Sequence, residues 1–206
     1  MECFGVGTGC KAQLVPCFGA VKAVVPFQIV DGELRQNRLC ALFCGRFFHL
    51  LCGKVGEYSK LLFVFPLYAD AIPVSLLNFL KALEVQPPEK KPVVSVLINC
   101  GFLEPQQNDV AIEMMRLFCR QNQYPFGAVL KIGSGEAILD SPFRFLAARK
   151  IRRFADVVAR GEYETLQVTM PLPKKMFAAA AETYWKNYGR KHGVTKEQME
   201  TMKIES

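Results

Sequence analysis

The sequence predicts an α/β protein with a doubly wound parallel sheet in three α/β/α layers. Three mainly apolar runs, Leu61–Phe65, Val93–Ile98 and Phe126–Ile132, have the length and composition of strands that are covered on both faces. Each run is followed by a loop and then by apolar residues at helical spacing. The connections are long enough for right-handed crossovers between parallel strands. Strand, loop and helix therefore occur three times in succession.

The stretch Leu61–Leu83 is the centre of this organisation. Pro66 ends its strand because proline has no N–H group to donate to a neighbouring strand. Pro73 stands where a helix can begin, and an apolar stripe follows it, consisting of Leu76, Leu77, Leu80 and Leu83. The loop between the two prolines thus lies at the carboxyl end of a strand, where open α/β sheets bind their ligands.

The next two units repeat this pattern. Asp109–Asn122 is predicted to form an amphipathic helix. Gly133-Ser134-Gly135 follows the third strand, and its glycines permit a tight turn or a close backbone approach to a ligand, of which the turn is favoured. Ser141 and Pro142 suit the N-cap and the first residue of a further helix, which Gly161 would end.

One face of that last helix is strongly basic. It carries one acidic residue, Asp156, against six basic ones: Arg144, Arg149, Lys150, Arg152, Arg153 and Arg160. Such a face could contact an acidic partner or membrane lipid, and it is also typical of a helix surface that only meets water.

The N-terminal third is irregular and rich in cysteine. Ala23–Val30 is a plausible strand, in which Pro26 indicates an edge or a bulge, and Leu39–Val55 has helix-like apolar spacing. Four potential zinc ligands lie in this region: Cys40, Cys44, His49 and Cys52. Their spacing matches no common zinc finger, and their apolar surroundings favour buried thiols, so no metal is predicted.

The composition is that of a globular protein. A chain of 206 residues with 50% hydrophobic and 22% charged residues suits one domain with a sizeable core. The net charge of +7 is a modest bias towards anionic ligands, among which phosphate-bearing cofactors qualify as readily as nucleic acid, and it is equally typical of a surface charge that only keeps the protein in solution. We expect free thiols, no membrane span, no nucleic-acid partner and a cytoplasmic location. Residues 170–206 are expected to form a helical extension, with a helix at Lys174–Tyr188 and a capping box at Thr195–Gln198.

Two loop motifs resemble a known family. The stretch LFVFPLYADAIPVSLLNFLKAL is similar to the third strand, flavin loop and following helix of flavodoxin-like NAD(P)H-dependent FMN reductases, and INCGFLEP resembles their next loop. The Gly-Ser-Gly segment and the tail with Pro173, Trp185 and His192-Gly193 also fit. The resemblance covers about residues 60–206, and it implies a single flavodoxin-like domain over residues 1–206 in which residues 1–57 are atypical.

The resemblance implies FMN at the carboxyl edge of the sheet and NAD(P)H as co-substrate, with a small molecule as electron acceptor. Pro66, Leu67, Tyr68 and Ala69 would line one side of the flavin ring. Backbone N–H groups of Asn99, Cys100, Gly101 and Phe102 would contact another edge. No side chain need act as acid or base, because the cofactor supplies the chemistry. A two-fold homodimer with the C-terminal tail near its interface is also expected.

The N-terminal third departs from the family pattern. Members of the family begin with a strand and a loop that holds the FMN phosphate, and the nearest substitute here is Ile29–Arg38. If Ala23–Val30 is the family's first strand, its second strand is missing. If it is the second, the central strand and the phosphate loop are missing. A flavodoxin-like domain without flavin, acting as an interaction or redox-thiol module, is therefore the alternative function.

Overall fold

The structure is a computed structural model that describes residues 24–26, 51–67 and 69–201. The chain divides into two compact units, Met1–Met170 and Pro171–Ser206, and each is described by itself.

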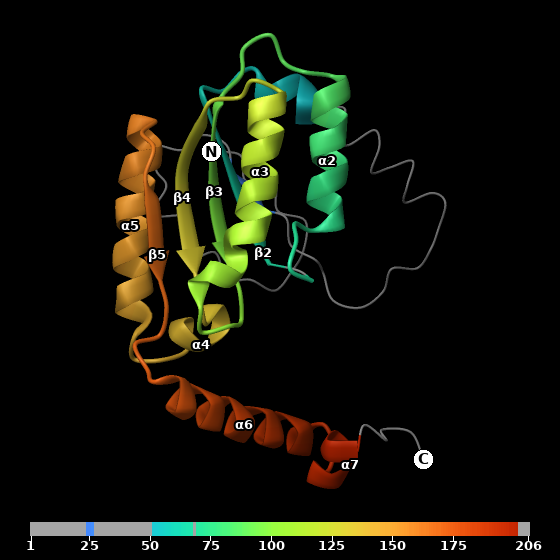
Figure 1. Cartoon of the computed structure of the whole chain (residues 1–206), viewed down its shortest axis with the longest axis vertical. Coiled ribbons are helices and arrows are strands. Elements are labelled where there is room, and N and C mark those ends of the chain that lie inside the picture. The colour runs from blue at the N-terminus through green and yellow to red at the C-terminus, as the bar shows by residue number, and fades with distance from the viewer. Residues whose placement is uncertain (1–23, 27–50, 68, 202–206) are drawn as a thin grey trace. The chain divides into compact units, whose positions relative to one another are not determined.

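The first unit is built on a five-stranded parallel sheet (Figure 1). The strands are β1 (Val24–Pro26), β2 (Lys60–Pro66), β3 (Val93–Asn99), β4 (Phe126–Ile132) and β5 (Thr165–Val168), and they lie in the sheet in chain order. Their carboxyl ends, drawn as arrowheads, all point to the same edge. The α/β class and the parallel sheet predicted from the sequence are confirmed.

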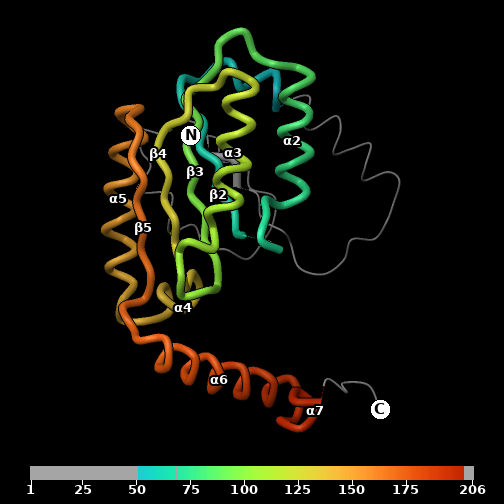
Figure 2. Tube along the Cα trace, viewed as in Figure 1, coloured from blue at the N-terminus to red at the C-terminus, as the bar shows by residue number. Residues whose placement is uncertain are grey.

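Helices cover both faces of the sheet. Helices α2 (Val74–Val85) and α3 (Asp109–Gln121) lie on one face, where a core of buried side chains includes Phe63, Phe79 and Met115. Helix α5 (Arg144–Arg160) covers the other face, and its buried residues include Phe154 and Val158. The Cα trace in Figure 2 crosses from one side to the other between residues 121 and 144. The sheet is therefore the middle of three layers, as expected for a flavodoxin-like fold.

A β-bulge alters strand β4 near its start. The register shifts between Val94 and Val96 of β3, which opposes one extra residue of β4 at this point. Gly127 is required there, because a Cβ atom on it would lie 2.8 Å from the Ser95 hydroxyl oxygen. The same hydroxyl accepts a hydrogen bond of 3.1 Å from the Ala128 N–H. The buried Ser95 side chain thus satisfies a backbone donor that the bulge removes from regular pairing.

Most predicted elements lie within a few residues of the observed ones. The strand predicted at Ala23–Val30 is described only at Val24–Pro26, which pairs with β2. In a flavodoxin-like sheet the family's first strand lies beside its third strand, and β2 was matched to the third. The pairing of β1 with β2 therefore favours the placement in which Ala23–Val30 is the family's first strand. Residues 51–55 are helical, and the rest of the helix predicted at Leu39–Val55 lies outside the described residues.

Three elements were missed, and the start of a fourth was placed differently. The sequence did not predict strand β5, the 3-10 turn η2 (Pro105–Asn108) or the short helix α4 (Gly135–Leu139). Helix α5 begins at Arg144, not after a Ser141 N-cap: the Ser141 hydroxyl accepts from the Phe143 N–H at 3.1 Å and shapes the preceding turn. Gly161 ends the helix with a φ of 72°, as predicted.

The second unit contains α6 (Lys174–Lys191) and α7 (Lys196–Thr201). The predicted capping box is confirmed: the Thr195 N–H donates to Gln198 Oε1 at 2.8 Å, and the Gln198 N–H donates to Thr195 Oγ1 at 3.2 Å. Among the residues that the structure describes, no helix is long and apolar enough to cross a membrane.

Candidate functional site

The carboxyl edge of the sheet is the candidate site, because two of the sequence motifs meet there. Each strand pairing continues one residue into the loop that follows it. The Leu67 N–H donates to the Asn99 carbonyl at 2.7 Å, and the Cys100 N–H donates to the Ile132 carbonyl at 2.9 Å. Pro66 and Asn99 are register partners. The sheet therefore places the loop after β2 beside the loop after β3.

Backbone hydrogen bonds clamp the loop after β3 to the loop after β4. The Ser134 N–H donates to the Phe102 carbonyl at 2.6 Å, and the Gly135 N–H donates to the Cys100 carbonyl at 2.9 Å. The carbonyl groups of Cys100 and Phe102 thus bind the protein's own backbone. A ligand would therefore meet the N–H donors of this loop.

Hydroxyl groups extend the clamp to the residue after β5. Thr169 Oγ1 donates to the Leu103 carbonyl at 2.5 Å and lies 3.1 Å from Ser134 Oγ. Ser134 is almost fully buried and has a φ of 53°, a left-handed conformation that costs a non-glycine residue on the order of 1 kcal/mol. The loops after three neighbouring strands are therefore held as one rigid edge.

The two glycines of the Gly-Ser-Gly segment make this clamp possible. A Cβ atom on Gly133 would lie 2.8 Å from the Leu103 carbonyl oxygen, and one on Gly135 would lie 2.6 Å from Asn99 Nδ2. Both distances are too short for real contacts. The glycines are thus required by close packing within the protein, and neither leaves open space for a ligand.

The Cys100 side chain points away from the surface of this edge. Its sulfur accepts a hydrogen bond from Asn108 Nδ2 at 3.4 Å, and its thiol lies 3.7 Å from the Phe102 carbonyl oxygen. Burial raises the pKa of the Cys100 thiol. The fully buried Asn108 also donates to the Pro105 carbonyl at 3.0 Å, so it anchors the turn that carries this loop. Sequence analysis missed Asn108, and its position just before a predicted helix was the only available signal.

Gly101 and Phe102 form the exposed part of the edge. The Phe102 side chain is 53% exposed, and the position of a Cβ on Gly101 has no atom within 4 Å. Among the described residues, neither of their N–H groups has a backbone partner, whereas the Cys100 N–H is already bound to Ile132. Of the N–H groups of residues 100–102, those of Gly101 and Phe102 are therefore the ones without a backbone partner in the described part of the chain.

The loop after β2 has an unusual backbone. Ala69 and Asp70 have φ angles of 47° and 58°, so two successive non-glycine residues adopt the left-handed conformation. Such residues persist only where their surroundings hold them, and they cluster at functional sites. Leu67 is half-buried and Ala69 is exposed. Tyr68, predicted to contact the flavin ring, lies outside the described residues.

The four potential zinc ligands, for which buried thiols were the favoured interpretation, lie only partly within the described chain. Cys40, Cys44 and His49 lie outside it, and Cys52 is buried in the hydrophobic core. In the described ranges, no group of three or more His, Cys, Asp or Glu residues could hold a metal ion.

The thiols that the structure describes are poorly suited to redox exchange. Cys52, Cys100 and Cys119 are free and buried. Burial raises the pKa of each, in the case of Cys119 to about 12. A reactive thiol needs the opposite shift, together with exposure. The redox-thiol alternative therefore gains no support from these three cysteines.

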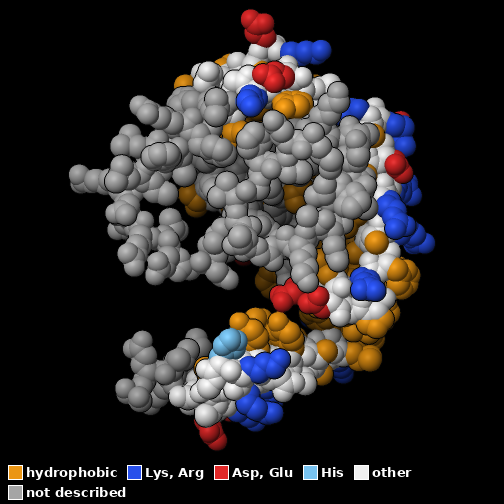
Figure 3. All heavy atoms as spheres, turned by 180° about the vertical axis from the view of Figure 1, so that it is seen from behind, with side chains coloured by type: hydrophobic (Ala, Val, Ile, Leu, Met, Phe, Trp, Pro, Cys, Tyr) orange, Lys and Arg blue, Asp and Glu red, His pale blue; other side chains and the backbone are white. Residues whose placement is uncertain are grey.

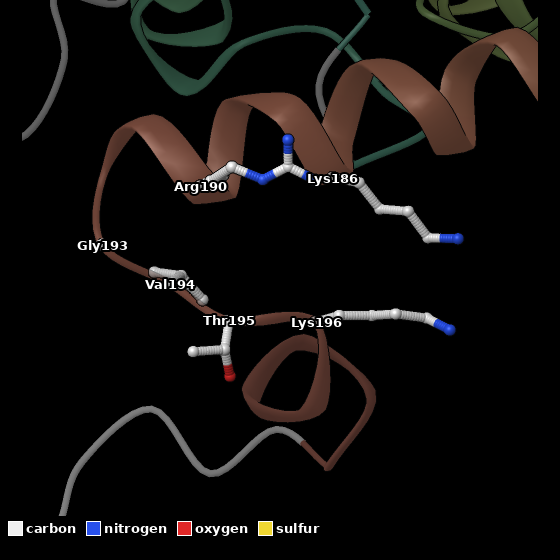
Figure 4. A pocket seen from close by; sticks show the side chains of 6 residues that line it. All are labelled: Lys186, Arg190, Gly193, Val194, Thr195 and Lys196. Atoms are coloured by element: carbon white, nitrogen blue, oxygen red, sulfur yellow. The ribbon is translucent and has the colours of Figure 1, made fainter.

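Two hollows are lined by residues that do not belong to this edge. The first, of about 390 Å³, separates the end of α6 from α7 (Figure 4). Lys186 and Lys196 extend along it in the same direction, and each is paired with a glutamate one helical turn away. Its cationic groups are thus largely matched within the second unit.

The second hollow, of about 380 Å³, lies beside α3, and Arg116 is among the residues that line it. Arg116 donates to the Tyr163 hydroxyl at 2.7 Å, and its Nε lies 3.1 Å from Glu113 Oε1. Its guanidinium carbon is 5.0 Å from the centre of the Phe126 ring. Hydrogen bonds from the Thr165 hydroxyl and from Arg116 lower the pKa of Tyr163. This arrangement fixes α3 against the start of β4 and β5.

Comparison with known proteins gives little further information. No family model matches the chain, and no curated protein matches it. Among solved structures, an azoreductase from Bacillus anthracis str. Sterne matches with 15% sequence identity and a TM-score of 0.39, covering 62% of this chain and 67% of that one. A likeness of this size supports neither a site nor an activity.

Proposed function

We propose that the protein is an FMN-dependent NAD(P)H oxidoreductase that passes electrons from a nicotinamide cofactor to a small-molecule acceptor. The observation that carries the proposal is the pair of available N–H donors at Gly101 and Phe102, on a rigid edge beside the left-handed loop at Ala69 and Asp70. Two loops that resemble flavin loops in sequence thus lie side by side at the edge where α/β sheets bind ligands.

The groups at this edge fit the ring of a flavin. An isoalloxazine ring needs apolar contacts on its faces and hydrogen-bond donors for the oxygen and nitrogen acceptors of its edge. Leu67, Ala69 and Phe102 supply apolar surface, and Gly101 and Phe102 supply donors. The open space beside Gly101 allows a planar ligand to approach the backbone closely.

The phosphate of FMN would need a second set of groups. Gly133 and Gly135 cannot form a phosphate cradle, because the protein's own atoms fill the space beside them. The segment proposed from sequence as a substitute phosphate loop, Ile29–Arg38, lies outside the described residues. The fit therefore concerns the ring and not the phosphate.

When bound, the flavin would supply the redox chemistry itself, by accepting a hydride and passing electrons on. The residues of this chain would hold and orient the ring. The clamp through Ser134 and Thr169 keeps the loop rigid, so Gly101 and Phe102 would meet the ring without a cost of ordering. The side chain of Phe102 would exclude water from part of the ring edge. Tyr68 is proposed to stack on the ring, and such a contact contributes about 0.5–1.5 kcal/mol beyond burial.

A titration tests the proposal. Protein freed of any ligand should bind FMN with quenching of the flavin fluorescence, and NADH or NADPH should then bleach the bound flavin in the absence of oxygen. Replacing Phe102 with Ala should weaken FMN binding, because an exposed aromatic side chain is removed from the ring edge. Absence of FMN binding would refute the proposal and leave the alternative, an interaction module without flavin.

We further propose a homodimer, in which a second copy helps to cover the flavin. It is supported by exposed apolar side chains, namely Phe102 at the carboxyl edge and Tyr184, Trp185 and Tyr188 on α6. Within α6, the rings of Tyr184 and Trp185 lie 5.2 Å apart, so they form a contiguous aromatic surface. Light scattering that gives the mass of one chain, 23.1 kDa, would refute the dimer.

A further inference from the structure

The solvent-facing side of α5 is more basic than any other helix face in the described chain. At 100° per residue, positions 149, 152, 153, 156 and 160 of this 17-residue helix lie on one side, and the residues that pack on the sheet lie on the other. Arg144 lies outside this arc, at the exposed first residue of the helix. Between Arg144 and Arg160 there are six basic residues and one acidic residue, a net +5 within a chain of net +7. In Figure 3 these blue side chains follow one another down the side of the molecule that α5 forms.

Part of this charge has no counter-charge. Arg153 is paired with Glu164, and Arg160 Nε lies 2.9 Å from Glu162 Oε2. Arg144, Arg149 and Arg152 are exposed, and no ion pair to them occurs among the described residues. Arg149 and Arg152 lie on this face, and Arg144 precedes them at the start of the helix. Three unmatched guanidinium groups along one helix are suited to binding phosphate groups, for which arginine is better shaped than lysine.

One exposed apolar side chain lies in the first turn of the same helix, and a second lies five residues before the helix begins. Phe145 is 61% exposed on α5, and Leu139 is 51% exposed at the end of α4. Phe145 is next to Arg144 in the chain and falls between Arg144 and Arg149 around the helix. A solvated helix face gains nothing from an exposed phenylalanine among arginines, whereas a surface that meets both phosphate groups and hydrocarbon does.

We propose that this face of α5, with Leu139, docks on an anionic lipid bilayer. The arginines would contact lipid phosphate groups over about 25 Å, the length of a 17-residue helix. Phe145 and Leu139 would enter the boundary between headgroups and acyl chains. A nucleic acid fits the face less well, because single strands are bound by aromatic side chains interleaved with cations, and only Phe145 is aromatic here. An acidic protein would match the charge but gives no role to the apolar pair.

Vesicle sedimentation tests the proposal with the full chain. The vesicles are pure phosphatidylcholine, or phosphatidylcholine with 30% phosphatidylserine. The test variant replaces Arg144, Arg149 and Arg152 with Gln. The matched control replaces Lys81, Lys90 and Arg120 with Gln, which removes the same charge from exposed positions on or near α2 and α3. Circular dichroism confirms that both variants fold.

We expect binding to the anionic vesicles only. Each basic residue near an anionic surface contributes about fivefold to partitioning, so the test variant should bind on the order of 100-fold more weakly while the control changes by less than about fivefold. Salt at 1 M shortens the Debye length to about 3 Å and should release the protein. Phe145→Ala should weaken binding at low salt without altering its dependence on phosphatidylserine.

Three results would overturn the proposal. The first is no binding to anionic vesicles. The second is an equal loss in the test variant and the control, which would assign binding to net charge alone. The third is binding of a fluorescent single-stranded or duplex oligonucleotide that requires Arg144, Arg149 and Arg152 while the vesicles are not bound.

Discussion

Replacing Gly133 with Ala should destabilise the protein through the clamp at the carboxyl edge. The added Cβ would lie 2.8 Å from the Leu103 carbonyl oxygen and 2.9 Å from Thr169 Oγ1. The first of these is a backbone atom, so the loop after β3 must move. Overpacking of this kind costs about 1–3 kcal/mol, and loss of the hydrogen bond from Thr169 to Leu103 adds about 1 kcal/mol. The lower entropy of the unfolded alanine chain offsets about 0.4–1 kcal/mol.

The net loss should be about 2 kcal/mol, which corresponds to a decrease in Tm of about 4–8 °C for a unit of this size. Urea unfolding followed by circular dichroism measures it. Gly101→Ala is the matched control, since its Cβ meets no atom within 4 Å, and its stability should stay within about 0.5 kcal/mol of the wild type. Equal stability of Gly133→Ala and the wild type would show that the three loops are not packed as described.

Three further predictions concern buried groups and a helix cap. Burial raises the pKa of Cys119 from 9.0 to about 12, so the folded state keeps a proton that the unfolded state loses above pH 9. The free energy of unfolding should therefore fall by up to about 1.4 kcal/mol per pH unit between pH 9 and 12. The midpoint of urea unfolding measures this fall, which should be smaller in Cys119→Ala. Ser95→Ala should lower the free energy of unfolding by about 1–3 kcal/mol in the same assay, because the buried Ala128 N–H loses its acceptor. An unchanged free energy of unfolding would contradict the hydrogen bond described at the bulge. Thr195→Ala should destabilise α7 by about 1 kcal/mol and speed amide exchange there but not in α5; unchanged exchange would contradict the capping box.

The strands and the main helices could be predicted because apolar periodicity is strong in them. Val93–Asn99 and Phe126–Ile132 are buried on both faces, so nearly every position is apolar and the pattern is unambiguous. Strand β5 has only four residues, of which Thr165 and Gln167 are exposed. Its alternation is too short to be distinguished from a loop, and only its pairing with β4 defines it.

The candidate edge could be located from the sequence, but its internal bonding could not. Gly133 and Gly135 indicated a special backbone, and the sequence left open whether a turn or a ligand required it. The atoms that occupy the space beside them come from Leu103 and Asn99, about 30 residues away in the chain. Likewise, the use of the Cys100 N–H by Ile132 depends on strand register, and it removes Cys100 from the predicted donors.

The most direct test of the flavin site is an amide-resolved NMR titration with FMN. We expect the N–H signals of Gly101 and Phe102 to shift on addition of FMN, because these two donors would bind the ring. The Cys100 N–H should shift less, since it already donates to Ile132, and amides in the middle of α5 should not shift. Saturable shifts at Gly101 and Phe102 would support the account. FMN binding that leaves both signals unchanged, or no binding at millimolar FMN, would contradict it.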